Sequence, residues 1–363
     1  MALSDLQLGL MGVGAAAVGA VWAYNKWQER GHRKLAERIL QGSQTHDVLL
    51  GAAGDEVAGR TEPGVRVEPG MSSHNISASS TGAATGVAAA SPWADDVADA
   101  VGSIDFSEAV AAPTLWAAQA EWSGHLGKPL HWIGQGQDGA WHLLTAHDAG
   151  RYVKVACALQ LADRRGAVTE GELDIFIDGV GAVATQLAGV AVTPDIDAVL
   201  DRARALDDFC ASVDFQLAVH VATVDGIPFA GTKLRGLAEA AGMQLGDDGR
   251  FHAADEEGHT LYTLGNVGVE LFDADTLRSL TTHGLTFSLD VPNVPQGPQV
   301  FDRMVAAASH MAQALGGILI DAQRTPLTDA MVAGIRGKIE EIQKQMVARQ
   351  IVAGSVRARR LFS

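Results

Sequence analysis

The motif with the clearest chemical precedent is the glycine-rich stretch GQGQDG at residues 134–139, which follows a strand-like segment. Its G-x-G-x-x-G spacing can hold a pyrophosphate when a helix begins directly after it. The next residues, 140–144, have the character of another strand, so no helix N-terminus is available there. We therefore interpret the motif as a glycine-rich hairpin loop and expect no nucleotide cofactor.

Other reactive side chains also lack the pattern that catalysis requires. Acidic pairs occur at 247–248 and 256–257, but their neighbours are glycine and polar residues. Two carboxylates that share acid–base work need apolar burial to separate their pKa values, so we interpret both pairs as loop charges. Cys157 and Cys210 have no metal-ligand spacing, and Cys157 lies in an apolar run that predicts a small buried side chain. The sequence predicts neither an enzyme nor a metal site.

The amino-acid composition limits the classes of partner that the chain can bind. The chain has 363 residues, of which 47% are hydrophobic, and its formal net charge is -16. This hydrophobic content supports a globular core. An excess of acidic residues repels nucleic acid and anionic lipid except where basic residues cluster. We expect no nucleic-acid partner and no small-molecule substrate.

The N-terminal 40 residues have the pattern of a membrane anchor. Residues 6–24 carry no charge and are about as long as the ~20 residues that span a bilayer. Trp22, Tyr24 and Trp27 lie where an interfacial aromatic belt is expected. The basic residues that follow are Lys26, Arg30, Arg33, Lys34 and Arg38.

This charge asymmetry predicts the orientation of the anchor. Because basic residues follow the apolar run, its N-terminus is expected in the periplasm and the remaining chain in the cytoplasm, attached to the inner membrane by a single pass. A cleaved signal peptide would need basic residues before the apolar run and small residues at a cleavage site. Residues 28–40 predict a basic juxtamembrane helix that contacts lipid headgroups, or else a short solvated helix leading into the next segment.

A tether is expected at residues 41–94. This stretch is rich in Gly, Ala, Ser and Thr and has few large apolar side chains. Such a segment cannot bury enough surface to offset the entropy of ordering, which predicts a disordered linker. About 50 residues of this composition give a typical reach of roughly 40 Å.

The remaining sequence predicts an α+β fold built from two tandem units, 95–212 and 213–352. Each unit has the order strand, helix, three strands, helix, strand, helix, and each is expected to form an antiparallel sheet with helices on one face. The order indicates a duplication, although α+β units also share such orders by chance. Residues 353–363 form a basic tail, which we expect to be a solvated end rather than a lipid contact.

Alternation and helical spacing identify the buried faces of these units. In the first unit Val153, Val155, Cys157 and Leu159 are expected to point inward. In the second unit Leu285, Phe287 and Leu289 alternate in the same way. A core-facing helix stripe is predicted from Val300, Met304, Ala307, Met311 and Leu315.

Two stretches of the second unit have a distinctive sequence, TTHGLTFSLDVPNV at 281–294 and VFDRMVAAASHMAQALGGILIDAQRTPLT at 300–328. Through these residues the second unit resembles the C-terminal domain of the ZipA division proteins. Residues 231–246 and LYTLGNVGVELFD at 261–273 are also similar. The anchor, basic segment and tether complete a ZipA-like architecture, and the first unit looks like a degenerate extra copy of the domain.

The resemblance implies a function and a site. It implies that the C-terminal peptide of FtsZ lies across an open sheet face and that the anchor tethers the division ring to inner-membrane lipid. The matching positions are Gln216, Asp248, Arg250, Val267, Val269, Thr286, Ser288 and Arg324. Apolar anchors normally carry the energy of such docking, whereas most of these positions are polar. The alternative is a division or envelope scaffold that binds another protein and has lost FtsZ binding.

Overall fold

The computed structural model describes residues 93–268 and 270–363. The expected anchor, the basic segment and nearly all of the expected tether lie outside these residues. Within the described ranges no helix combines the length and apolar character needed to cross a bilayer. The last two positions of the expected tether belong to the folded part, because Ala94 is buried against the first sheet.

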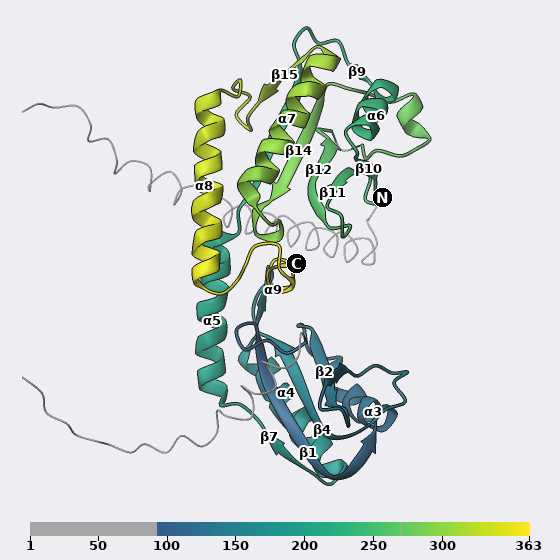
Figure 1. Ribbon diagram of the computed structural model, residues 1–363, viewed down its shortest axis with the longest axis vertical. Helices are drawn as coiled ribbons and strands as arrows, with labels where there is room; N and C mark the ends of the chain where they lie inside the picture. The colour runs from purple at the N-terminus through teal and green to yellow at the C-terminus, as the bar shows by residue number, and fades with distance from the viewer. Residues whose placement is uncertain (1–92, 269) are drawn as a thin grey trace, which may run out of the picture. The chain divides into compact units, whose positions relative to one another are not determined.

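The first unit is built on a five-stranded antiparallel sheet with the order β3-β2-β4-β1-β7 (Figure 1). Its elements are β1 (Asp99–Ala111), α3 (Ala112–Ser123), β2 (Leu130–Gln135), β3 (Trp141–Leu143), β4 (Arg151–Gln160), β5 (Ala162–Asp163), β6 (Gly166–Ala167), α4 (Glu170–Gln186), β7 (Gly189–Val192) and α5 (Ile196–Val213). The glycine-rich motif is the loop of the β2–β3 hairpin, as the sequence predicted.

Strand β4 buries most of the residues predicted to point inward, and Ala156 and Ala158 between them are buried as well. Val155, Cys157 and Leu159 are fully buried, and burial raises the pKa of the Cys157 thiol. Val153 is 50% exposed, so its predicted inward orientation is wrong. The register between β1 and β4 shifts between Asp105 and Val110, and this irregularity breaks the pleat, with Tyr152 buried in place of Val153.

The second unit has a six-stranded antiparallel sheet with the order β10-β11-β12-β14-β8-β15. Its elements are β8 (Gln216–Thr223), β9 (Phe229–Ala230), α6 (Gly231–Ala240), β10 (Gln244–Leu245), β11 (Phe251–Ala254), β12 (Thr260–Asn266), β13 (Thr281–Thr282), β14 (Gly284–Asp290), α7 (Gly297–Leu315), β15 (Gly317–Ile320) and α8 (Asp329–Ala348). The short β9 and β13 pair with each other beside this sheet.

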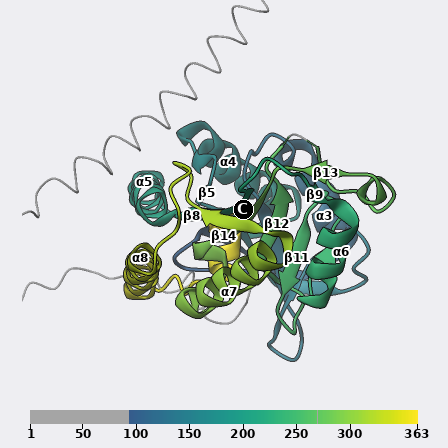
Figure 2. The same cartoon turned by 90° about the horizontal axis from the view of Figure 1, so that it is seen from above.

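Helix α7 covers one face of the second sheet (Figure 2). Phe287 of β14 is fully buried on this face, and Val300, Met304 and Met311 of the predicted stripe are buried in the same core. The stripe is therefore confirmed. The helix ends at Gly316, whose positive φ of 73° suits a left-handed C-cap. The opposite face of the sheet carries the shorter and more polar side chains.

The two units share an element order but not a complete strand order. In both sheets the first strand lies beside the last one, as in β4-β1-β7 and β14-β8-β15. The hairpins differ, because β2 pairs with β4 in the first unit, whereas the later strand β12 pairs with β14 in the second. The duplication therefore stays a prediction from the sequence.

The C-terminal segment is folded rather than frayed. Residues Val356–Leu361 form helix α9, and Leu361 and Phe362 are almost completely buried. The expectation of a solvated end is therefore wrong. Gln160 of β4 donates a hydrogen bond to the Arg360 carbonyl at 2.9 Å, and Asn293 of the second unit donates to the Phe362 carbonyl at 3.0 Å. The segment thus bonds to both units.

Candidate peptide-binding face

The face of the second sheet opposite α7 is the candidate site. One row across it is apolar: Ile318 of β15 pairs with Ala222 of β8, Ala222 with Gly284 of β14, and the Val267 amide donates to the Gly284 carbonyl at 3.1 Å. We call these four residues the apolar row. Ile318 and Val267 are 42% and 55% exposed, so the two ends of the apolar row present large apolar side chains to solvent.

Gly284 allows the Val267 side chain to lie close above β14. A Cβ at this position would come within 2.9 Å of Val267 Cγ2, closer than side chains normally pack, so Val267 already takes up this space. The cavity here has a volume of 880 Å³, and Arg324 and Asn266 also line it. Arg324 adopts a left-handed φ of 63° in a turn. The turn is closed by a hydrogen bond of 3.0 Å that the Arg324 backbone N–H donates to the Asp321 carbonyl.

The centre of the face is polar. His220 of β8 and Thr286 of β14 are paired across the strands, and a hydrogen bond of 3.0 Å joins His220 Nδ1 to Thr286 Oγ1. Burial lowers the pKa of His220, although the nearby Asp321 carboxylate opposes the shift. One step further along the strands, Ser288 lies between Ala218 and Thr263. Small polar side chains here offer hydrogen bonds but little apolar area.

The far end of the face meets the first unit. Arg164, in the turn between β5 and β6, contacts Asp214 at 2.8 Å and Asp290 at 2.6 Å. Oriented with its amide oxygen toward this guanidinium, Gln216 accepts hydrogen bonds from Arg164 at 3.0 and 3.2 Å. Gln216 therefore lies on the open face but is already engaged by the first unit.

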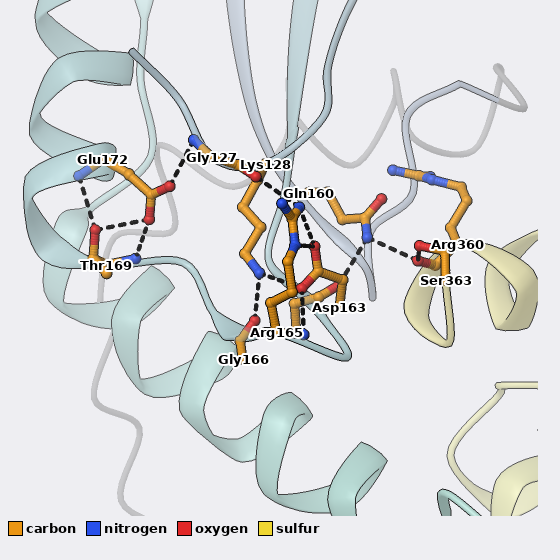
Figure 3. Close-up of polar contacts among 11 residues, drawn as sticks. Gly127, Lys128, Gln160, Asp163, Arg165, Gly166, Thr169, Glu172, Arg360 and Ser363 are labelled. Carbon is orange, nitrogen blue, oxygen red and sulfur yellow. Dashed lines mark hydrogen bonds and ion pairs between the residues drawn. The ribbon is translucent and has the colours of Figure 1, made fainter. Parts of the chain in front are cut away.

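A buried ion pair holds the turn that carries Arg164 (Figure 3). Lys128 Nζ lies 2.6 Å from Asp163 Oδ1 and also donates to the Gly166 carbonyl at 2.6 Å. Arg165 contacts the second Asp163 oxygen at 2.7 Å. Burial opposes the charge on Asp163, but the hydrogen bonds from Arg165 and Lys128 outweigh it and lower the pKa of this carboxyl.

A second cavity, of 510 Å³, lies at this end of the face. Gln216, Arg250 and Ser288 line it, together with residues of the C-terminal segment. Asp248 lies outside both cavities, in the turn before β11, where its carboxylate contacts His252 Nε2 at 2.8 Å. Burial alone would raise the pKa of Asp248, yet the contact with His252, together with the amide and the charge of Arg250, outweighs it and the pKa is lowered.

The structure thus distributes the predicted site residues unevenly. Val267 and Arg324 line the apolar end, Thr286 lies in the centre, and Gln216, Arg250 and Ser288 line the opposite end. Asp248 is peripheral, and Val269 lies outside the described residues. Sequence reasoning missed His220, Ala222, Ile318 and Arg359. Alternation along β8 indicates the first two, but Ile318 and Arg359 become neighbours of the face only through the tertiary fold.

Elsewhere in the described ranges, one group of side chains has metal-ligand character. Ligand atoms of Asp255, Glu257 and His259 lie within 4.8 Å of one another in the turn between β11 and β12. Asp255 already closes this turn by accepting the His259 amide at 2.7 Å, and its second carboxylate oxygen lies 3.3 Å from the His259 ring. These contacts account for the cluster without a bound ion.

An antiparallel sheet with helices on one face and an apolar-to-polar groove on the other defines a docking module for a protein segment. Comparison with known proteins agrees. Residues 216–338 match the family described as ZipA, C-terminal FtsZ-binding domain. The chain is therefore ZipA-like, and its second unit is the part that resembles this family.

Curated relatives carry the same family name. The cell division protein ZipA of Ectopseudomonas mendocina is 27% identical over 190 residues, which cover 51% of this chain and 68% of the relative. That of Stutzerimonas stutzeri is 32% identical over 145 residues, covering 39% and 53%. That of Pseudomonas aeruginosa (strain PAO1) is 32% identical over 139 residues, covering 37% and 48%. The chain spans about half the length of the latter two.

Proposed function

We propose that this chain is a membrane-anchored division adaptor that binds the C-terminal peptide of FtsZ on the open face of its second sheet. In this proposal residues 6–24 cross the inner membrane once, the N-terminus is periplasmic and both sheet units are cytoplasmic. The protein thereby tethers the division ring to inner-membrane lipid. Its role is mechanical attachment and involves neither catalysis nor a cofactor.

The apolar row is the observation that carries the proposal. Ile318 and Val267 expose apolar area in the wall of the 880 Å³ cavity, within the segment that matches the FtsZ-binding family. Burial of apolar area supplies most of the free energy of peptide docking. An apolar side chain of the peptide is proposed to enter this cavity, which Arg324 also lines.

The other expected contact positions contribute to peptide binding to different extents in this proposal. Thr286 and Ser288 offer hydrogen bonds along the peptide, and Arg250 offers a charge at the far end. Gln216 contributes little because Arg164 already engages it. Asp248 acts at most through His252, and Val269 remains a proposed contact from the resemblance alone.

A fluorescence-anisotropy titration tests the peptide contact. The full chain, purified in detergent micelles, is titrated into a labelled peptide from the FtsZ C-terminus. Saturable micromolar binding is expected, and Val267→Ser should weaken it several-fold because it removes apolar area from the row. Arg303→Gln is the matched control, since Arg303 is exposed on α7, the helix that covers the opposite face. A flat curve for the unmodified chain would refute FtsZ binding.

Membrane attachment has its own test. Paired substitutions Val13→Asp and Val18→Asp place two charges inside the proposed span, each costing about 2.5–3.5 kcal/mol in a membrane helix. We expect the unmodified chain to sediment with membranes and to resist salt extraction, whereas the charged variant should become soluble. The pair Val13→Ala and Val18→Ala is the control. Equal sedimentation of the charged variant and its control would contradict the anchor.

The polar centre of the face favours a second candidate function. The side chains of His220 and Thr286 form a hydrogen bond with each other, and Ser288 adds little apolar area. The face therefore has fewer apolar anchors than tight peptide docking normally uses. A division or envelope scaffold that binds another protein fits these features. The same titration separates the two functions, because the scaffold predicts no saturable FtsZ-peptide binding by a folded chain.

A further inference from the structure

Arginines at the far end of the open face mark a second specificity element. Arg250 precedes β11, and Arg359 belongs to α9, yet both line the 510 Å³ cavity with Ser288 and Asn293. Among the described residues neither guanidinium has a hydrogen-bond or ion-pair partner. Two unpaired arginines beside one groove are notable in a chain whose formal net charge is -16.

The acidic groups around this cavity are already engaged. Asp290 contacts Arg164 at 2.6 Å and accepts a hydrogen bond from Asn293 at 2.9 Å. Asp248 contacts His252 at 2.8 Å. Asp248 interacts electrostatically with Arg250 but makes no ion pair with it, so the guanidiniums of Arg250 and Arg359 are available for direct contact with an incoming carboxylate.

Helix α9 divides its basic side chains between two roles. Arg357 contacts Asp95 at 2.5 Å, and Arg360 pairs with Asp99 of β1. These two contacts attach the helix to the first unit. Arg359 makes neither contact and instead lines the cavity on the second unit. Because its neighbours fix the helix, Arg359 can hold its charge beside the groove at little conformational cost.

We infer that the cavity of Arg250 and Arg359 binds an acidic segment of the docked peptide, so that the first unit and the C-terminal helix help to select the partner. This inference rests on the proposed function. It also orients the peptide: an apolar side chain enters the 880 Å³ cavity beside the apolar row, and carboxylates lie about the arginines at the opposite end of the strands. The partner is thus a peptide with separate apolar and acidic parts.

The experiment compares two probes with the full chain in detergent micelles. One probe is the labelled FtsZ C-terminal peptide, and the other is the same peptide with every Asp and Glu changed to Asn and Gln. The unmodified chain should bind the amide peptide about two- to fivefold more weakly for each carboxylate that no longer pairs with an arginine. Arg250→Gln and Arg359→Gln should each weaken binding of the acidic peptide by a similar factor and reduce the discrimination between the probes.

Charge reversal makes the assignment specific. Arg359→Glu should weaken the acidic peptide further, and a peptide with its carboxylates changed to Lys should bind this variant better than it binds the unmodified chain. Arg303→Gln is the control, because it removes an exposed arginine from the helix face and should leave discrimination unchanged. Circular dichroism spectra and melting curves that match the unmodified chain establish that each variant is folded.

The outcomes separate this inference from the proposed function. Equal binding of both probes by the unmodified chain, or unchanged discrimination in both arginine variants, refutes the acidic contact while leaving FtsZ binding in place. Failure of the acidic peptide to bind at all refutes the proposed function and this inference together.

Discussion

Replacement of Lys128 by methionine tests how the first unit holds the end of the candidate face. The side chains of Lys128 and Asp163 are only 6% and 3% exposed, and their charged atoms lie 2.6 Å apart. Methionine keeps the aliphatic stem but leaves the Asp163 carboxylate buried beside Arg165 alone. Removing one partner of a buried ion pair costs about 3–5 kcal/mol. Because Arg165 still contacts Asp163, we expect the lower figure, about 3 kcal/mol.

This destabilisation is measurable by thermal denaturation. For a folded part of this size, a cost of about 3 kcal/mol lowers the melting temperature by about 6–12 °C. Lys154→Met is the matched control, since Lys154 lies 3.7 Å from Asp105 and both side chains are substantially exposed. An exposed pair contributes at most about 1 kcal/mol, so the control should melt within about 4 °C of the unmodified chain.

A double variant isolates the interaction itself. Lys128→Met combined with Asp163→Leu removes both charges, so its cost should be smaller than the sum of the two single variants. The reasoning would be refuted if Lys128→Met melted like the Lys154→Met control, or if the double variant showed simple additivity. In either case another contact would be holding the turn that carries Arg164.

Further predictions address the face, the acid response and the C-terminal segment. Ser288→Leu should tighten FtsZ-peptide binding about fivefold by adding apolar area to the polar centre, and weaker binding would count against docking there. Gly284→Ala should weaken peptide binding several-fold, because the new Cβ would lie 2.9 Å from Val267 Cγ2 and would displace this side chain of the apolar row; an unchanged dissociation constant would contradict docking on the row. The lowered pKa of Asp163 stabilises the fold above its unfolded value of 3.8, and this contribution is lost as pH falls through the folded value, so Asp163→Asn should flatten the acid limb of a stability–pH profile. Deletion of residues 353–363 removes two nearly fully buried side chains and should destabilise the chain by at least about 4 kcal/mol in urea denaturation, whereas an unchanged midpoint would mean that the segment is dispensable.

The sequence by itself determined the local elements. Alternation located β14 and the buried part of β4, and the spacing of Val300, Met304 and Met311 located the core side of α7. These inferences succeeded because a strand with one buried face repeats every two residues and a helix every 3.6, so the periodicity is written along the chain. The residues at 281–294 and 300–328 also sufficed to indicate the ZipA-like domain.

The tertiary structure decided which elements meet. The periodicity of a strand does not determine which strand of a hairpin lies next to the rest of the sheet. The shared element order therefore did not predict that β2 lies beside β4 in the first sheet, whereas β12 lies beside β14 in the second. Val153 points outward because a register shift with a distant strand interrupts its own alternation. The basic tail became part of the candidate site only because Leu361 and Phe362 are buried, which places Arg359 beside a groove whose other arginine is more than a hundred residues away. Such long-range contacts depend on the burial of the whole core, and no local pattern encodes them.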